Sequence, residues 1–395
     1  MMPTTASKAA FRQAANPGPL RLEIVESDEE FDALQPEWDA LVDRMATRSP
    51  FLRWDWMRTW WDIHSGEFDL CIAVARDVGG RAVGIAPFVL GYDREGSRSH
   101  VKQLIFLAGG GVAQGERMDF IVPTGWEMAV TPDLCAAFEI LENRWDCIRL
   151  NHIPEESPNL PFIRRAMEQA GLSAGVLNQS DCRLIQLPSS WEEYAAQRPG
   201  DWRRNLERNW RQVVRDHGAR KCVAGRDAAP MEVFDRLGDL HERRYSRRES
   251  LFIQPDAWRL HRKIAEKWIW TGQAVLTYIE TNLGISAAVY GFVERGEFFM
   301  FQLGWDPALA RYSLGRWAVN WSIEHCIDHH LETYDLLPGE FRYKSELSDE
   351  TRRLLDLETF HSANANASLF RRMRDVRRRC HHQLSKLTAG IRSRK

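Results

Sequence analysis

The sequence lacks the cysteine patterns of a disulfide-stabilised or metal-binding protein. Seven cysteines are scattered over 395 residues, and no two of them form a CxxC pair. An odd number of dispersed cysteines argues against both a disulfide framework and a zinc site. We therefore expect reduced thiols in the hydrophobic core and no bound metal.

Long apolar runs are missing as well. No run approaches the ~20 residues that a membrane-spanning helix needs, and the first fifteen residues lack the apolar core of a secretory signal. An apolar content of 44% is enough for well-packed cores, and the length suggests two or three domains. We expect a globular protein located in the cytoplasm.

Familiar nucleotide and metal motifs are also absent, since the chain has neither GxGxxG, nor GxxxxGK[ST], nor HExxH. The loop AGGGVAQGERMD (108–119) carries four glycines but not the lysine of a phosphate-binding loop. It predicts a flexible segment, or one that binds an acceptor between domains. His325 and His329 share a predicted helix face, and we expect a structural or surface role for them.

Positive charge is concentrated at one end. The chain has a net charge of −2, yet residues 371–395 contain ten Lys or Arg against Asp375 alone. We expect a basic C-terminal helix over 363–395. Two interpretations stay open: a contact with an anionic membrane surface, nucleic acid or an acidic partner, or a solvated terminal helix.

The first half alternates strands and helices after an unstructured leader (1–20). Apolar spacing predicts a helix over 27–45 with Ser27 as its cap. A hairpin is predicted from FDLCIAVARD and RAVGIAPFVLGYD, which flank Val78 and two glycines. Further strands are predicted at VKQLIFLA, DFIVP, CIRLNHI and RLIQL, and further helices over 128–141 and 160–170.

The second half repeats this order after a charged helical linker (188–218). Helices are predicted over 231–248, 256–268 and 313–329, and strands at AVLTYIET, ISAAVYGFVE, EFFMFQLGW, ETYDLL and RLLDLETF. Hairpins that lead into a helix and another strand, twice over, predict an α/β (mixed α+β) fold rather than a doubly wound parallel sheet. The two modules would span 21–187 and 219–362.

The segment DPALARYSLGRWAV suggests where the chemistry lies. A helix that begins near Ser313 offers free N–H groups and its positive dipole end to an anion. Gly315 would let a ligand approach the backbone, and Arg311 and Arg316 could neutralise phosphate. The alternative interpretation is that Ser313 is an ordinary N-cap.

The residues that follow resemble a known family. Ser313, Gly315, Asp335, Gly339 and the pair Tyr343-Lys344 appear in the order found in the acetyltransferase domain of cellulose-biosynthesis-type (CelD-like) members of the GNAT superfamily. The segment HERRY (241–245), the arginines of the linker, and Asp119 after the glycine loop also resemble that family. The likeness extends from about Leu20 to Phe360.

This resemblance implies two GNAT-like modules, as in the Fem-type transferases that use aminoacyl-tRNA. It also implies an acyl-CoA donor, with its thioester between the strands FFMFQLGW and ETYDLL. The donor's pyrophosphate would lie on the loop residues Arg311, Tyr312, Ser313, Leu314, Gly315 and Arg316. One glycine stands here where the fuller GNAT loop has two.

Acyl transfer needs a proton acceptor, a stabilised oxyanion and a protonated leaving group. Tyr343 is the candidate general acid, and Glu340 is the candidate general base that takes a proton from the acceptor. Lys344 could pair with a phosphate or an acidic acceptor. Arg244 could grip an anionic acceptor, or lie on a solvated helix face.

The function that follows is acyl-CoA-dependent N-acyl transfer, most simply acetyl transfer, to an amino sugar or another envelope or exopolysaccharide precursor. The saccharide acceptor rests on the resemblance alone. Two alternatives remain: aminoacyl transfer from charged tRNA, and a non-catalytic accessory module of polysaccharide synthesis. The protein would be cytoplasmic, or peripheral to a membrane through its basic tail.

Overall fold

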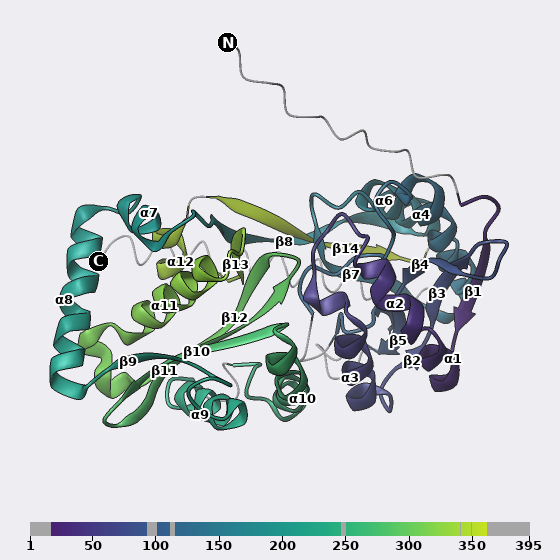
Figure 1. Cartoon of the computed structure of the whole chain (residues 1–395). Helices are drawn as coiled ribbons and strands as arrows, with labels where there is room; N and C mark the ends of the chain where they lie inside the picture. Colours follow the sequence, from purple (N-terminus) through teal and green to yellow (C-terminus); the bar gives the residue numbers. More distant parts are fainter. Residues whose placement is uncertain are drawn as a thin grey trace, which may run out of the picture.

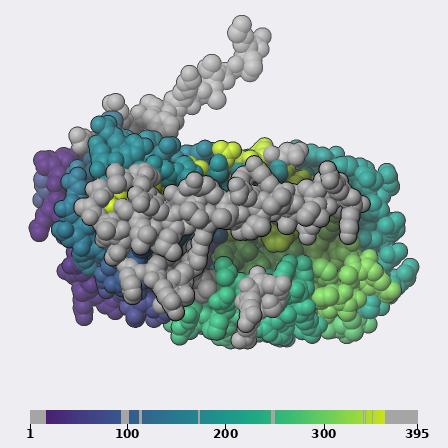
Figure 2. Space-filling view, turned by 180° about the vertical axis from the view of Figure 1, so that it is seen from behind, coloured from purple at the N-terminus to yellow at the C-terminus, as the bar shows by residue number. Residues whose placement is uncertain are grey.

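The computed structural model describes residues 17–92, 101–110, 115–245, 250–339, 341–348 and 350–361. These residues form two halves that lie side by side, each with helices packed on strands (Figure 1). Viewed from behind, purple to blue residues occupy one end of the molecule and green residues the other (Figure 2). Residues 1–16 of the predicted leader and the predicted C-terminal helix (363–395) lie outside the described residues.

One sheet of eleven strands runs through both halves. Its strands are antiparallel except for the two parallel pairs β6 with β7 and β12 with β13. In spatial order they are β2 (Asp69–Leu70), β5 (Phe88–Tyr92), β6 (Lys102–Phe106), β7 (Cys147–Pro154), β14 (Thr351–Phe360), β8 (Leu172–Gln186), β13 (Thr333–Pro338), β12 (Glu297–Trp305), β11 (Gly284–Glu294), β10 (Ala274–Thr281) and β9 (Arg220–Val223). The predicted mixed, mainly antiparallel architecture is confirmed.

A second, three-stranded sheet belongs to the first half. It contains β1 (Arg21–Val25), β3 (Ile72–Arg76) and β4 (Ala82–Ala86), all antiparallel. Each run of the predicted hairpin is therefore divided between the two sheets. The first run contains β2 and β3, and the second contains β4 and β5; β3 and β4 pair in the small sheet, whereas β2 and β5 lie in the large sheet. Pro87 separates β4 from β5 and cannot donate a ladder hydrogen bond. The predicted strand DFIVP is reduced to a bridge between Ile85 and Ile121.

Helices cover both sheets. They are α1 (Asp28–Ala33), α2 (Gln35–Val42), α3 (Trp54–His64), α4 (Glu127–Cys135), α5 (Ala137–Ile140), α6 (Leu160–Ala170), α7 (Trp191–Ala196), α8 (Gly200–His217), α9 (Pro230–Glu242), α10 (Pro255–Thr271), α11 (Leu314–Asp328) and α12 (Arg342–Leu347), with short 3-10 turns η1 (Pro50–Leu52), η2 (Glu142–Arg144) and η3 (Pro307–Tyr312). Ser27 caps α1 in a capping box, as predicted. The expected single helix is divided at Leu34, because Pro36, in the first turn of α2, has no N–H to donate to the carbonyl four residues earlier.

Strand β11 shows why helices lie on both faces of the second half. Successive side chains of a strand point to opposite faces. Ala288 and Tyr290 pack in one hydrophobic cluster with residues of α9 and α10, whereas Ala287 and Val289 pack in another with residues of α11. The six described cysteines are all buried, as expected for thiols of the hydrophobic core.

Strands β8 and β14 join the two halves. β8 pairs with β13 of the second half and with β14, while β14 pairs on its other side with β7 of the first half. In Figure 1 the yellow β14 accordingly lies beside the teal β8, between the halves. The predicted segments 21–187, 188–218 and 219–362 describe the order of the chain, whereas strand pairing crosses their boundaries.

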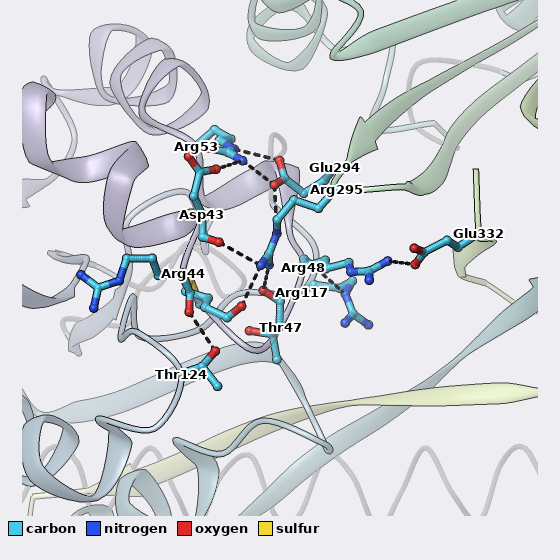
Figure 3. Close-up of polar contacts among 11 residues, drawn as sticks. Asp43, Arg44, Thr47, Arg48, Arg53, Arg117, Thr124, Glu294, Arg295 and Glu332 are labelled. Atoms are coloured by element: carbon cyan, nitrogen blue, oxygen red, sulfur yellow. Dashed lines mark hydrogen bonds and ion pairs between the residues drawn. The ribbon is translucent and has the colours of Figure 1, made fainter. Parts of the chain in front are cut away.

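Polar contacts also fix loop 43–49 of the first half against the β11–β12 turn (Figure 3). Arg295, in that turn, donates to three carbonyls of the loop, the nearest being Thr47 O at 2.5 Å. Arg53 forms an ion pair of 2.5 Å with Glu294, whose side chain is 3% exposed. Since these contacts link the two halves, a site between them has a defined geometry.

Candidate active site

A cavity of about 610 Å³ opens where β12 and β13 separate. These parallel strands pair only over 297–299 and 333–335 and diverge beyond that point. Residues 300–303 of β12 and 336–338 of β13 therefore form facing walls, and the start of α11 closes one end. The cavity lies between the strands FFMFQLGW and ETYDLL, where the resemblance implied the thioester.

The start of α11 presents backbone rather than a side-chain cap. Ser313 has left-handed backbone angles (φ 56°, ψ 40°), and its hydroxyl does not cap the helix. The hydroxyl instead accepts a hydrogen bond from Asn209 Nδ2 at 3.3 Å. The N-cap interpretation of the Ser313 side chain is therefore wrong. Leu314 and Gly315 line the cavity, and the first N–H groups of a helix have no intrahelical acceptor.

Gly315 is required here by a close approach. A Cβ atom added at Gly315 would lie 2.8 Å from Cδ1 of Trp305 and 3.0 Å from its Nε1. Trp305 lines the same cavity. Any larger residue would displace the indole and narrow the space in front of the helix start.

Two of the predicted cofactor-binding residues point elsewhere. Tyr312 is buried and donates its phenol hydrogen to Asp216 Oδ2 at 2.9 Å. The Arg311 guanidinium lies 4.5 Å from the Tyr312 ring, also near Asp216. Neither residue lines the described cavity, so their assignment to the cofactor is corrected: they fasten η3 to the end of α8. Arg316 does line the cavity, but it pairs with Glu346 of α12.

Tyr343 of α12 lies in the cavity wall, as its predicted role requires. Burial raises the pKa of its phenol above the usual range, and the neighbouring Tyr245 adds to this effect. The phenol is therefore protonated at neutral pH and can act as a proton donor. Glu340, the predicted base, lies outside the described residues.

Lys344 has a structural role instead of the predicted phosphate contact. Its ammonium donates to the carbonyls of Leu336, Leu337 and Pro338 at 2.7, 2.9 and 2.9 Å. An ammonium has three hydrogens, so none remains for a phosphate. Burial lowers the pKa of Lys344 to about 8, and the group is still mainly charged at neutral pH. Lys344 thus holds the irregular end of β13 in shape.

Arg244 faces the cavity rather than forming part of a solvated helix face. Its guanidinium lies 4.5 Å from the Trp305 ring and 4.9 Å from the Tyr245 ring, and it donates to the Tyr245 hydroxyl at 3.1 Å. Among the residues that the structure describes, no carboxylate pairs with Arg244. It supplies the cavity with an available positive charge.

Sequence reasoning missed Glu116 and two histidines of the cavity wall. Burial lowers the pKa of His241 to about 4 and that of His261 to about 3, so both are neutral at pH 7. Glu116 comes from the glycine-containing loop of the first half. The sequence signal for this carboxylate is its place in the glycine-containing loop, which was predicted to bind an acceptor between domains.

Asp119 lies in the same loop and is a structural residue. It is fully buried and accepts hydrogen bonds from Thr47, Ser157, Asn159 and its neighbour's N–H. Burial raises its pKa to about 6, since desolvation outweighs these donors. Asp119 therefore anchors loop 43–49 and the Glu116 loop to each other.

Comparisons with known proteins agree with this geometry. The family model described as "Acetyltransferase (GNAT) domain" matches residues 200–345. The protein carries a GNAT acetyltransferase domain and is an acyl-transfer enzyme. The GNAT match runs from the start of α8 into α12, and it includes both strands of the cavity and the start of α11. Among curated proteins, none matches the sequence.

Solved structures are similar in fold to both halves of this protein. FemX is similar with a TM-score of 0.58 and 9% identity, over 88% of this chain and 99% of FemX. The C-terminal domain of an Agrobacterium fabrum protein, provisionally assigned as a lysylphosphatidylglycerol synthetase, has a TM-score of 0.51 and 14% identity, over 87% of this chain and 95% of that domain. At such identities the likeness concerns the fold alone.

No helix in the described ranges is long and apolar enough to span a membrane. Nor do three or more His, Cys, Asp or Glu side chains gather as a metal site in the described part of the chain. The ring centroids of His325 and His329 lie 4.0 Å apart with the rings tilted by 41°, and His329 Nδ1 lies 2.8 Å from the His325 carbonyl.

Proposed function

We propose that the cavity binds an acyl-CoA donor and that the enzyme transfers its acyl group directly to an amine. One observation carries this proposal: the gap between β12 and β13 ends at a helix start that no side chain caps. Diphosphate oxygens suit such a place, because free N–H groups and the helix dipole both favour negative charge. The cavity volume falls within the range of ligand sites.

The chain's own residues supply the remaining chemistry. Gly315 keeps the helix start open, and Arg244 adds positive charge beside it. The protonated Tyr343 phenol donates to the departing thiolate. We propose an amino sugar or another envelope or exopolysaccharide precursor as acceptor, and the CelD-like order of Ser313, Gly315, Asp335 and Tyr343 supports this choice.

Replacing Gly315 with valine tests the donor site. We expect CoA to bind the wild-type protein, and the variant to bind it roughly 10- to 100-fold more weakly through the loss of one or two charge-assisted hydrogen bonds. Isothermal titration with CoA measures both affinities. Gly66→Val is the matched control, since a Cβ at Gly66 meets nothing within 4 Å. Absence of CoA binding to the wild-type protein would contradict the proposed function.

A charged-tRNA donor is a second candidate, and α8 supports it. Arg204, Arg208, Arg211 and Arg215 are exposed and recur at helical spacing on one side of this helix. Such a stripe suits a phosphate backbone. Retention of tRNA at moderate salt, with the full chain and after deletion of residues 371–395, would distinguish this donor from CoA. The deletion also tests whether the basic tail binds an anionic partner.

A further inference from the structure

Glu116 brings a carboxylate from the first half into the cavity of the second. It is the one carboxylate among the described residues of the cavity lining. Its Oε2 atom lies 2.8 Å from His152 Nδ1, and 18% of its side chain stays exposed. The cavity therefore combines a GNAT domain with a carboxylate that the family match does not cover.

His152 is held beside Glu116 in an unusual conformation. Its φ of 59° lies in the left-handed region, which residues other than glycine rarely adopt. Its backbone N–H donates to Asp356 Oδ1 at 2.9 Å, and its backbone carbonyl accepts a hydrogen bond from Met118 N at 3.0 Å. Strained backbone held by so many contacts is typical of functional sites.

The cluster of Glu116, His152 and Asp356 carries an excess of negative charge. Burial by itself disfavours a charged imidazole, but the carboxylates of Glu116 and Asp356 and the carbonyl of Gly115 together outweigh it and raise the pKa of His152 to about 9. One imidazolium thus faces two carboxylates. Six further charged groups interact with one another nearby, and their charges balance, with three positive and three negative groups: Lys344, Arg117, Arg352, Asp335, Glu156 and Glu297.

The lining of the cavity therefore carries both signs of charge. The start of α11 and Arg244 contribute positive charge, and Glu116 contributes a negative group. We infer that Glu116, held by His152, binds the ammonium group of the acceptor and accepts its proton, so that the first half selects a cationic acceptor. This inference rests on the proposed function.

The proton and electron balance of the step is complete. The acceptor ammonium gives one proton to Glu116, and the freed nitrogen lone pair attacks the acyl carbon. This attack forms the C–N bond. The C–S bond then breaks, and the departing thiolate takes a proton from Tyr343. The nitrogen of the new amide gives its surplus proton to the Tyr343 phenolate, which restores the phenol. Glu116 releases the proton that it accepted to solvent. The products are an amide, a free thiol and one proton.

Binding of glucosamine and glucose to the CoA-saturated protein tests the inference. The two sugars differ at one carbon, which carries an ammonium group in glucosamine and a hydroxyl group in glucose. We expect glucosamine to bind wild-type protein roughly tenfold more tightly than glucose, as a charge-assisted contact implies. Glu116→Gln should abolish this preference without changing CoA affinity, whereas Glu116→Asp should keep most of it. Titration calorimetry measures each affinity.

Glu155→Gln serves as the matched control. Glu155 is an exposed carboxylate of the same half, pairs with Arg353 and does not line the cavity. A wild type without preference for glucosamine would overturn the inference, as would a preference that survives Glu116→Gln. CoA binding is measured separately, so a failed donor site is recognised independently of a failed acceptor site.

Discussion

Replacing Tyr343 with phenylalanine is expected to lower kcat by about 10²- to 10⁴-fold, the usual contribution of a positioned general acid. The phenol lies in the cavity wall, and burial raises its pKa, so the wild-type group carries a proton to donate. The ring remains in the variant, and its affinity for CoA should not change. Release of thiol from acetyl-CoA, with glucosamine as the acceptor, measures kcat.

Tyr92→Phe is the control for this experiment, because Tyr92 is 59% exposed and lies in the first half, outside the cavity. It should retain wild-type activity. If Tyr343→Phe also retained activity within about twofold, Tyr343 would not be the general acid. Another group would then have to protonate the leaving thiolate.

Replacing Arg53 with methionine is expected to lower the free energy of unfolding by about 3–5 kcal/mol, the cost of breaking a buried ion pair from one side. The side chains of Arg53 and Glu294 are 12% and 3% exposed, and they join the two halves (Figure 3). Without Arg53, the Glu294 carboxylate would stay buried beside Arg295 alone, at 3.4 Å. Denaturant unfolding followed by circular dichroism measures the loss.

Arg48→Met provides the comparison, since Arg48 also crosses between the halves but pairs with Glu332 at the surface. Its side chain is 32% exposed and that of Glu332 is 64% exposed. Solvent screening limits such pairs to about 0–1 kcal/mol. Equal losses in the two variants would mean that burial of the Arg53–Glu294 pair has no special importance.

Much of the local structure follows from the sequence. Strand-like runs such as ISAAVYGFVE and EFFMFQLGW predict β11 and β12, because the turn residues Arg295 and Gly296 separate them. The helices α9, α10 and α11 follow from apolar spacing in the same way. Where a proline intervenes, as at Pro36 and Pro87, the predicted element is divided in the structure.

The candidate site was predictable only in part. Ser313, Gly315 and Tyr343 were identified from their order, and the structure brings all three to one cavity. Lys344 and Arg311 were assigned wrongly, because charge in a sequence does not show whether a carbonyl or another side chain already satisfies it. Three carbonyls surround the Lys344 ammonium, and none of them is evident from residue spacing.

The elements, their order and the GNAT resemblance of the second half could be predicted, since they depend on periodicity and on short motifs. Two features emerge in three dimensions alone: β14 returns to pair with β7, and Glu116 enters the cavity although it lies about 200 residues before α11 in the chain. Strand pairing and pocket walls bring together residues that are distant in sequence. Such contacts depend on how the elements pack in space, which no local pattern records.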